Sequence, residues 1–337
     1  IMDAPKILRG HRHSVQSLSF ATSDVGDLLF SGDDGGSILV WNLEDLRPHL
    51  TIKADGNAIL YVSAVNRGVV SQSRYGNLCL WDWEVNTDHP ISSTSTNSSS
   101  FCKAATHGII QDTFVVVAPT VDNTNLGFWD PRSNIFKECF RLREQAASVG
   151  MCTALCSAED AGPYYLVAAY EDGSLRLWDM RFSDPCWKFR VHRQPVFAVT
   201  ACRSSLSCLT FVSGSADGQI IQTRISLEES IAACCQQGDS RSHPSPVHDW
   251  VVDQVPSLAS NASCGVGSMA SKGDSSLVSA GCWDGHIRIY DAHRGQLISC
   301  LRGHKGAVHA VQFSPFNSLL ASAGQDTNVA LWIPEVS

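Results

Sequence analysis

The stretch Leu319–Trp332 reads LLASAGQDTNVALW, and its pattern decides the fold. An apolar pair precedes a run of small residues, a turn carries Asp326, and a short strand closes on Trp332. Six other stretches repeat this order, although the third of them repeats it only weakly. They are LLFSGDDGGSILVWN (Leu28–Asn42), VVSQSRYGNLCLWD (Val69–Asp82), VVVAPTVDNTNLGFWD (Val115–Asp130), LVAAYEDGSLRLWD (Leu166–Asp179), FVSGSADGQIIQTR (Phe211–Arg224) and LVSAGCWDGHIRIYD (Leu277–Asp291).

Seven repeats at this period predict an all-β fold, a seven-bladed β-propeller that occupies residues 1–337 as one domain. A single four-stranded unit cannot bury both of its faces, so such units stack side by side around an axis. The opening segment Ala4–Gly10 is similar to Gln296–Gly303, the predicted outer strand before the last repeat. We therefore expect the N-terminal strand to complete the last blade and close the ring, which removes exposed sheet edges.

Two polar segments interrupt the repeats. Residues 225–268 are rich in Ser, Pro, Gly and Cys, which predicts a long and mostly flexible insertion between blades five and six. One strand of blade six must come from this segment, and Gly265–Ala270 is the predicted one. Cys234 and Cys235 lie in the insertion, and the sequence leaves their redox state open. The run of residues 92–100 predicts a polar loop between blades two and three.

Composition excludes several classes of function. The chain has 25 Lys and Arg against 33 Asp and Glu, a net charge of −8, and this balance argues against a nucleic-acid-binding surface. No apolar run reaches about 18 residues and no signal-peptide pattern is found, so we expect no membrane association. The 13 cysteines are odd in number and scattered over predicted strands, as expected for free thiols in a cytosolic or nuclear protein.

The search for catalytic or metal-binding residues favours structural explanations. His11 and His13 alternate at a predicted strand start, which fits one inward and one outward side chain better than two metal ligands. His243, His248 and Asp249 lack zinc-ligand spacing. The glycine-rich run Gly32–Gly36 lacks the Lys-Ser/Thr pair of a phosphate-binding loop, and there is no nucleophile elbow. We predict a protein that is not an enzyme, with no cofactor and no metal.

The repeats resemble the WD-repeat family over nearly the whole chain. A Gly-His pair opens the first and last blades at His11 and His304, and Val191-His192 is a variant of it. The resemblance implies that this histidine bonds the turn Asp, a strand Ser or Thr, and the closing Trp. In the last blade the set is His304, Ser322, Asp326 and Trp332. The turn Asp is also present as Asp172, Asp217 and Asp284, whereas the first three blades have Gly35, Tyr75 and Asn123 in that position.

Several signatures are similar to one subgroup, the guanine-nucleotide-binding-protein beta-subunit-like proteins and the fungal ASTRA-associated WD-repeat proteins. The most specific are the blade-four segments 170–174 and 177–179 and the blade-six residues Trp283-Asp284; the chain departs from the group at Cys282 and at Gly285-His286. The resemblance implies a non-catalytic scaffold that works with co-chaperones in maturing and stabilising phosphatidylinositol-3-kinase-related kinases, in cytoplasm and nucleus. Its partners are then other proteins, and we expect a monomer within a complex.

A second function remains open. Trp129-Asp130-Pro131-Arg132 and Trp178-Asp179-Met180-Arg181 resemble the WD-x-Arg box of substrate receptors for cullin–RING ubiquitin ligases. This resemblance implies that Arg132 and Arg181 contact the ligase adaptor, whereas the alternative is that both are ordinary solvated turn residues.

We predict that partners bind the face formed by the turns between the second and third strands and by the segments leading into the first strands. Aromatic residues and Arg dominate interface energies, and the sequence places several of them there. The predicted partner-binding residues are Arg12, Arg74, Tyr75, Tyr170, Glu171, Arg193, Trp283 and Lys305.

Overall fold

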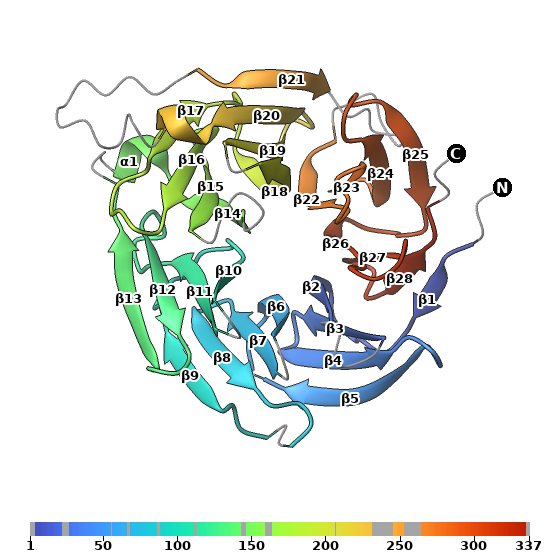
Figure 1. Ribbon diagram of the computed structural model, residues 1–337. Coiled ribbons are helices and arrows are strands. Elements are labelled where there is room, and N and C mark those ends of the chain that lie inside the picture. The colour runs from blue at the N-terminus through green and yellow to red at the C-terminus, as the bar shows by residue number, and fades with distance from the viewer. Residues whose placement is uncertain are drawn as a thin grey trace.

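The computed structural model describes residues 4–21, 27–54, 56–65, 68–85, 88–110, 113–142, 146–158, 164–205, 207–230, 245–252 and 264–334. These residues form seven four-stranded antiparallel sheets arranged as a ring (Figure 1). Each sheet is one blade, and we name its strands a to d from the centre outward. No helix within these ranges is long and apolar enough to cross a membrane.

Blades one to four follow each other in chain order. Blade one contains β2 (Val15–Phe20), β3 (Leu28–Asp33), β4 (Ser37–Asn42) and β5 (Arg47–Lys53). Blade two contains β6 (Ile59–Val65), β7 (Gly68–Ser73), β8 (Asn77–Trp81) and β9 (Ser92–Ser95). Blade three contains β10 (Ala105–Ile110), β11 (Thr113–Pro119), β12 (Leu126–Asp130) and β13 (Ile135–Phe140). The short α1 (Ala146–Val149) leads to blade four, with β14 (Cys152–Ser157), β15 (Tyr165–Tyr170), β16 (Ser174–Asp179) and β17 (Trp187–Arg190).

The remaining three blades complete the ring. Blade five contains β18 (Val196–Ser205), β19 (Cys208–Ser215), β20 (Ile220–Ser226) and β21 (Val247–Val252). Blade six contains β22 (Val266–Ser271), β23 (Leu277–Cys282), β24 (His286–Asp291) and β25 (Leu297–Arg302). Blade seven contains β26 (Val308–Phe313), β27 (Leu320–Gly324), β28 (Val329–Trp332) and β1 (Lys6–Leu8).

The hydrophobic core is divided among the seams between blades. Buried apolar side chains of the described residues form seven clusters, one at each seam. Between blades four and five, for example, Trp187 meets Phe211 edge-on, with ring centroids 6.0 Å apart. Both faces of the middle strands are therefore buried, because a neighbouring blade covers each face. The ring is stable only as a whole, since no blade has a core of its own.

The N-terminal strand closes the ring, as the sequence predicts. β1 pairs antiparallel with β28, with Lys6 opposite Leu331 and Leu8 opposite Val329. Figure 1 shows β1 beside β28. Leu8 is buried in the cluster between blades seven and one. The strand thus supplies backbone hydrogen bonds and an apolar contact at the same seam.

The polar run 92–100 is not the loop expected from its composition. Its first part is β9, the outer strand of blade two, where Ser92 lies opposite Leu80. Beyond the strand, the hydroxyls of Thr96, Ser98 and Ser100 each accept a hydrogen bond from the N–H two residues further along. Serine and threonine side chains can satisfy the backbone locally in this way, so a segment without apolar residues still packs against the ring.

The predicted insertion 225–268 is shorter in the structure. Its first residues end β20, Val247–Val252 is the outer strand of blade five, and Val266–Ser271 is the first strand of blade six. The prediction of a strand at Gly265–Ala270 is therefore confirmed within one residue. Residues 231–244 and 253–263, including Cys234 and Cys235, lie outside the described residues.

One side chain ties the blades together across the centre. Lys103 lies just before β10 of blade three, and its Nζ donates to the carbonyl oxygens of Gln16 in blade one and His309 in blade seven, each at 2.6 Å. Desolvation lowers the pKa of Lys103 to about 8. The ammonium group thus joins three blades that are not all neighbours in the ring.

Candidate protein-interaction surface

Blade seven contains the complete polar network that the sequence predicts. His304 Nδ1 lies 2.9 Å from Asp326 Oδ1, and His304 Nε2 lies 2.7 Å from Ser322 Oγ. The indole N–H of Trp332 donates to the same hydroxyl at 2.8 Å. Although burial raises it, the contact with His304 and the N–H of Lys305 hold the pKa of Asp326 below its usual value. These residues join strands b and c to the segment before strand a and hold the blade together.

Blade one has the same network, with an acid that the motif alignment missed. His11 bonds Asp33 at 2.8 Å and Ser31 at 2.6 Å, and Trp41 donates to Ser31 at 2.7 Å. The aligned position, Gly35, has no carboxylate, but Asp33 two residues earlier replaces it. Asp33 Oδ1 also accepts the N–H groups of Gly35 and Ser37, each at 3.0 Å.

Blades two and three differ from each other in the polar groups that hold their turns and strands. In blade three the turn acid is Asp122, beside the aligned Asn123, and its Oδ1 accepts the N–H groups of Thr124 and Asn125 at 3.0 and 2.9 Å. In blade two Trp81 donates to Ser71 at 2.9 Å, while Tyr75 points outward. The turn in blade three is therefore held by a neighbouring acid, as in blade one.

The other predicted turn acids have local roles. Asp172 accepts the N–H of Ser174 at 2.8 Å, and Asp217 accepts the N–H of Gln219 at 3.1 Å. His192 bonds Ser213 at 2.8 Å. Desolvation lowers the pKa of His192 to about 4. In these blades the acid shapes the turn and no hydrogen bond joins it to a histidine within the described part of the chain.

Blade six replaces the histidine by an arginine. The guanidinium of Arg288 donates to both oxygens of Asp284, at 3.1 and 2.7 Å. The side chains are 2% and 4% exposed, so this is a buried ion pair. Despite the opposing effect of burial, Arg288 holds the pKa of Asp284 well below its usual value.

Two of the remaining histidine candidates, His13 and His248, make contacts within their blades. The ring of His13 packs over Gly35. His248 and Asp249 belong to β21 and face blade five's third strand: His248 Nδ1 lies 3.3 Å from Thr223 Oγ1, and Asp249 pairs with Arg224 at 2.5 Å. His243 lies outside the described residues.

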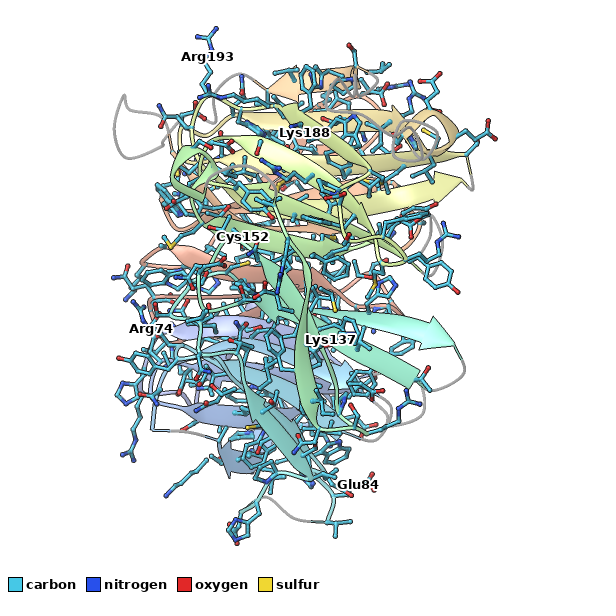
Figure 2. The ribbon with its side chains drawn as sticks, turned by 90° about the vertical axis from the view of Figure 1, so that its left-hand side faces the viewer. Arg74, Glu84, Lys137, Cys152, Lys188 and Arg193 are labelled. Atoms are coloured by element: carbon cyan, nitrogen blue, oxygen red, sulfur yellow. The ribbon has the colours of Figure 1, made fainter. Side chains whose placement is uncertain are left out.

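The turns between strands b and c, together with the segments leading into strand a, form one face of the disc, which we call the b–c face. Figure 2 shows Arg74 and Arg193 on the same side of the disc. Tyr75 is 58% exposed and Trp283 is 46% exposed, so neither side chain packs inside its turn. Arg12, Arg193 and Lys305 are exposed as well.

Two further aromatic residues extend this face, and the sequence did not single them out. Phe101 lies under the guanidinium of Arg74, with Cζ 3.8 Å from the ring centroid. Phe197 lies beside Trp283, with ring centroids 5.8 Å apart. Both phenylalanines are partly exposed. Pattern reasoning within one blade cannot find them, because each pair joins residues from two neighbouring blades.

Two of the predicted partner-binding residues have internal roles. Tyr170 is fully buried in the seam between blades three and four, and its hydroxyl donates to the carbonyl of Thr124 at 3.3 Å. Its assignment to the binding surface is wrong, because the last residue of β15 points into the seam. Glu171 accepts the N–H of Met151 at 2.9 Å and so supports the segment that enters blade four.

Arg132 and Arg181 lie in the turns between strands c and d, on the opposite face. Each folds back onto the aspartate two residues earlier. Arg132 contacts Asp130 at 3.0 and 2.8 Å, and Arg181 contacts Asp179 at 2.8 and 2.5 Å. The two arginine side chains remain about half exposed or more, at 64% and 49%.

Comparison with known proteins agrees with this architecture. The family model "WD domain, G-beta repeat" matches residues 4–42, 253–291 and 295–332. Guanine nucleotide-binding protein subunit beta-like protein 1 of Mus musculus is 24% identical over 97% of this chain and 94% of its own length. ASTRA-associated protein 1 of Schizosaccharomyces pombe is 24% identical over 97% of both chains. The β-propeller domain of Cps50 (Swd1) from Myceliophteria thermophila superposes with a TM-score of 0.75 at 15% identity, covering 98% of this chain and all of that domain.

The chain is thus a seven-bladed β-propeller that contains WD repeats. Its homologues with this architecture include the proteins named guanine nucleotide-binding protein subunit beta-like protein 1 and ASTRA-associated protein 1.

Proposed function

We propose that this protein is an interaction scaffold that assists the co-chaperone-dependent maturation of phosphatidylinositol-3-kinase-related kinases, in cytoplasm and nucleus. The observation that supports the proposal most is the end-to-end similarity to ASTRA-associated protein 1, which covers 97% of both chains. A match of this extent aligns the whole ring and its turns. A rigid ring of this kind acts by holding other proteins in a fixed arrangement.

The b–c face provides the contacts that such a scaffold needs. Two exposed pairs, Trp283 with Phe197 and Arg74 with Phe101, lie on opposite halves of the ring. Large aromatic residues and Arg supply most interface energy, and removal of one hot-spot residue costs about 2 kcal/mol or more. We therefore expect partners to bind at these two pairs.

Affinity purification with quantitative mass spectrometry tests the surface. The double variant Trp283→Ala, Phe197→Ala should lose at least tenfold of each bound partner while its thermal midpoint stays that of a folded propeller. Phe316→Ala is the matched control, because Phe316 is 50% exposed and lies in the turn between β26 and β27 on the opposite face. Full partner recovery by the folded double variant would disprove the assignment of this surface.

Depletion of the protein from cells tests the function. We expect co-chaperones to be recovered with the wild type and the steady-state level of the kinases to fall on depletion. The variant Arg132→Ala, Arg181→Ala should retain these partners, since both arginines lie on the other face. Unchanged kinase levels, together with recovery of a cullin adaptor that this variant loses, would instead support a ubiquitin-ligase receptor.

A further inference from the structure

Blade six contains an unusual pair of cysteines in place of the histidine network. Cys264 lies two residues before the first strand, β22, and Cys282 ends the second strand, β23. Their sulfur atoms and a carboxylate oxygen of Asp284 all lie within 4.8 Å of one another. The two cysteines are 5% and 0% exposed. The pair therefore lies just beneath the turn that carries the exposed Trp283.

The charges around the pair favour thiol chemistry over metal binding. Both oxygens of Asp284 already accept hydrogen bonds from Arg288. A divalent cation at this aspartate would have to compete with a buried guanidinium and lie next to its positive charge. His286 Nδ1 also lies 3.3 Å from Asp284 Oδ1, so the carboxylate already has two nitrogen-bearing neighbours, and the two sulfur atoms are the nucleophilic groups of the cluster.

The two thiols are not equivalent. A hydrogen bond from Cys282 lowers the pKa of Cys264, and the N–H of Asp284, 3.2 Å from Cys264 Sγ, lowers it further, although burial and the carboxylate of Asp284 oppose both effects. The same contact with Cys264, together with burial, raises the pKa of Cys282. Cys264 is thus the sulfur that ionises first, and Cys282 holds a proton that it can give up in a second step. The thiolate is the reactive form of cysteine.

The chain contains a second pair of buried cysteines, which serves as a comparison. Cys102 and Cys152 lie at the seam between blades three and four with sulfur atoms 3.7 Å apart, and both are fully buried. Here burial is the largest effect, and it raises the pKa of Cys102 well above its usual value. Sulfur proximity is therefore common to both pairs, whereas the thiol pKa is lowered at Cys264 and raised at Cys102.

We infer that Cys264 and Cys282 form a reactive dithiol that hydroperoxides oxidise to a disulfide within blade six. The Cys264 thiolate attacks one oxygen of the peroxide, the O–O bond breaks, and the released hydroxide takes up a proton to become water. Cys282 Sγ then attacks the sulfur of the Cys264 sulfenic acid, and its proton leaves with the hydroxyl group as a second water. Two thiols and one hydrogen peroxide thus give one disulfide and two waters.

The disulfide would lock the base of the exposed turn. The ring of Trp283 lies against Gly265, where an added Cβ would come within 2.4 Å of the ring, and next to Gly267. Gly265 follows Cys264, and Trp283 follows Cys282. The new bond would therefore join the two segments between which the indole packs. Dithiothreitol should reverse the reaction.

Peptide mapping of the full-length, reduced protein after hydrogen peroxide treatment tests this inference. The remaining thiols are alkylated before proteolysis. We expect the Cys264–Cys282 disulfide to form at least tenfold faster than a Cys102–Cys152 disulfide. This measurement needs no substitution, so it does not depend on the folding of a variant. Equal rates for the two pairs, or alkylation of Cys264 and Cys282 while other cysteines oxidise, would overturn the inference.

Single variants test the order of the steps. Cys282→Ser should leave Cys264 as a sulfenic acid that dimedone labels, whereas Cys264→Ser should leave Cys282 unlabelled. Cys102→Ser is the control and should not change the reaction in blade six. Absence of dimedone labelling in folded Cys282→Ser would contradict the proposal. Stoichiometric binding of added Zn²⁺ that protects both thiols from peroxide would also overturn it, in favour of a metal site.

Discussion

In blades one and seven a histidine, a serine, an aspartate and a tryptophan share one hydrogen-bond network, whereas in blades three and five the same positions are only partly joined. His11 and His304 use both ring nitrogens. In blade five, His192 Nδ1 is buried and has no hydrogen-bond partner among the described residues. The same holds in blade three for the indole nitrogen of Trp129.

The difference follows the closure of the ring. Blades one and seven meet at the seam where the N-terminal strand joins the chain's last strand. The segment 9–14 connects β1 of blade seven to β2 of blade one, so closure depends on the hydrogen bonds between β1 and β28 inside blade seven, and a rigid polar network in each of the two blades holds the strands around this junction in place. In the blades in the middle of the chain all four strands are consecutive in sequence and their turns join them covalently, so a weaker network is enough there. Satisfied buried networks rigidify a structure, whereas unpaired polar groups weaken it.

Deletion of residues 1–8 should have the largest effect on this comparison. It removes β1, leaves the edge of β28 unpaired and takes Leu8 out of the core. Exposed strand edges promote aggregation, so we expect aggregation or loss of cooperative unfolding in size-exclusion chromatography and calorimetry. Deletion of residues 1–3, which precede β1, is the control. A monomer with an unchanged thermal midpoint after the longer deletion would disprove the role of β1.

Replacement of the histidine should destabilise a blade with a complete network more than a blade with an incomplete one. His11→Ala leaves the buried carboxylate of Asp33 without its main partner, and we expect a loss of about 3 kcal/mol in the free energy of unfolding. His192→Ala removes a single hydrogen bond to Ser213, for which we expect about 1 kcal/mol. Urea denaturation measures both values. Equal losses in the free energy of unfolding would show that the complete network contributes no more to stability than the single hydrogen bond of His192.

The incomplete network should also make stability depend on pH. Desolvation holds the pKa of His192 at about 4, below the value of about 6.5 in an unfolded chain. Between these values only the unfolded chain binds the proton, so the stabilising contribution is complete above pH 6.5 and is lost as the pH falls towards 4. We expect a decrease on the order of 2 kcal/mol from pH 7 to pH 4.5.

Urea denaturation at the two pH values should show this decrease in the wild type and a smaller one in His192→Gln. The variant His293→Gln is the control, because His293 is exposed and its replacement should leave the dependence as it is. The same pH dependence in wild type and His192→Gln would exclude His192 as its source.

A tryptophan pair provides the smallest and most closely matched test. Trp41 and Trp129 are both fully buried, but only Trp41 donates a hydrogen bond, to Ser31 at 2.7 Å. Replacement by Phe removes similar volume at both sites. We therefore expect Trp41→Phe to cost about 1 kcal/mol more than Trp129→Phe, measured by urea denaturation. A larger loss at Trp129 would indicate that its indole nitrogen is satisfied in solution.

Much of the fold could be predicted because the repeat is strong. The spacing of the motif predicts the number of blades, and the similarity of the segments 4–10 and 296–303 predicts the closing strand. The polar composition of residues 92–95 predicts a loop, whereas these residues form the outer strand β9. An outer strand needs only backbone pairing, and polar side chains do not prevent it. The turn acids Asp33 and Asp122 were missed because a carboxylate can reach the same N–H groups from a neighbouring position.

The candidate site was harder to predict than the fold. Tyr170 was assigned to the surface because it precedes a turn, yet it ends a strand whose neighbours cover both faces. Phe101 and Phe197 were missed because their partners, Arg74 and Trp283, come from other blades. A one-dimensional pattern orders residues within a blade, but it does not show which residues meet across a seam.

The sequence alone determined the strand order, the number of blades and the histidine network of the last blade, because each of these depends on spacing within about 40 residues of chain, the length of one repeat. Only the tertiary structure decided which aromatic and basic side chains are exposed together, and which two cysteines face each other in blade six. Those properties depend on contacts between strands that are distant along the chain or come from different blades, and the ring brings such residues together only when it closes.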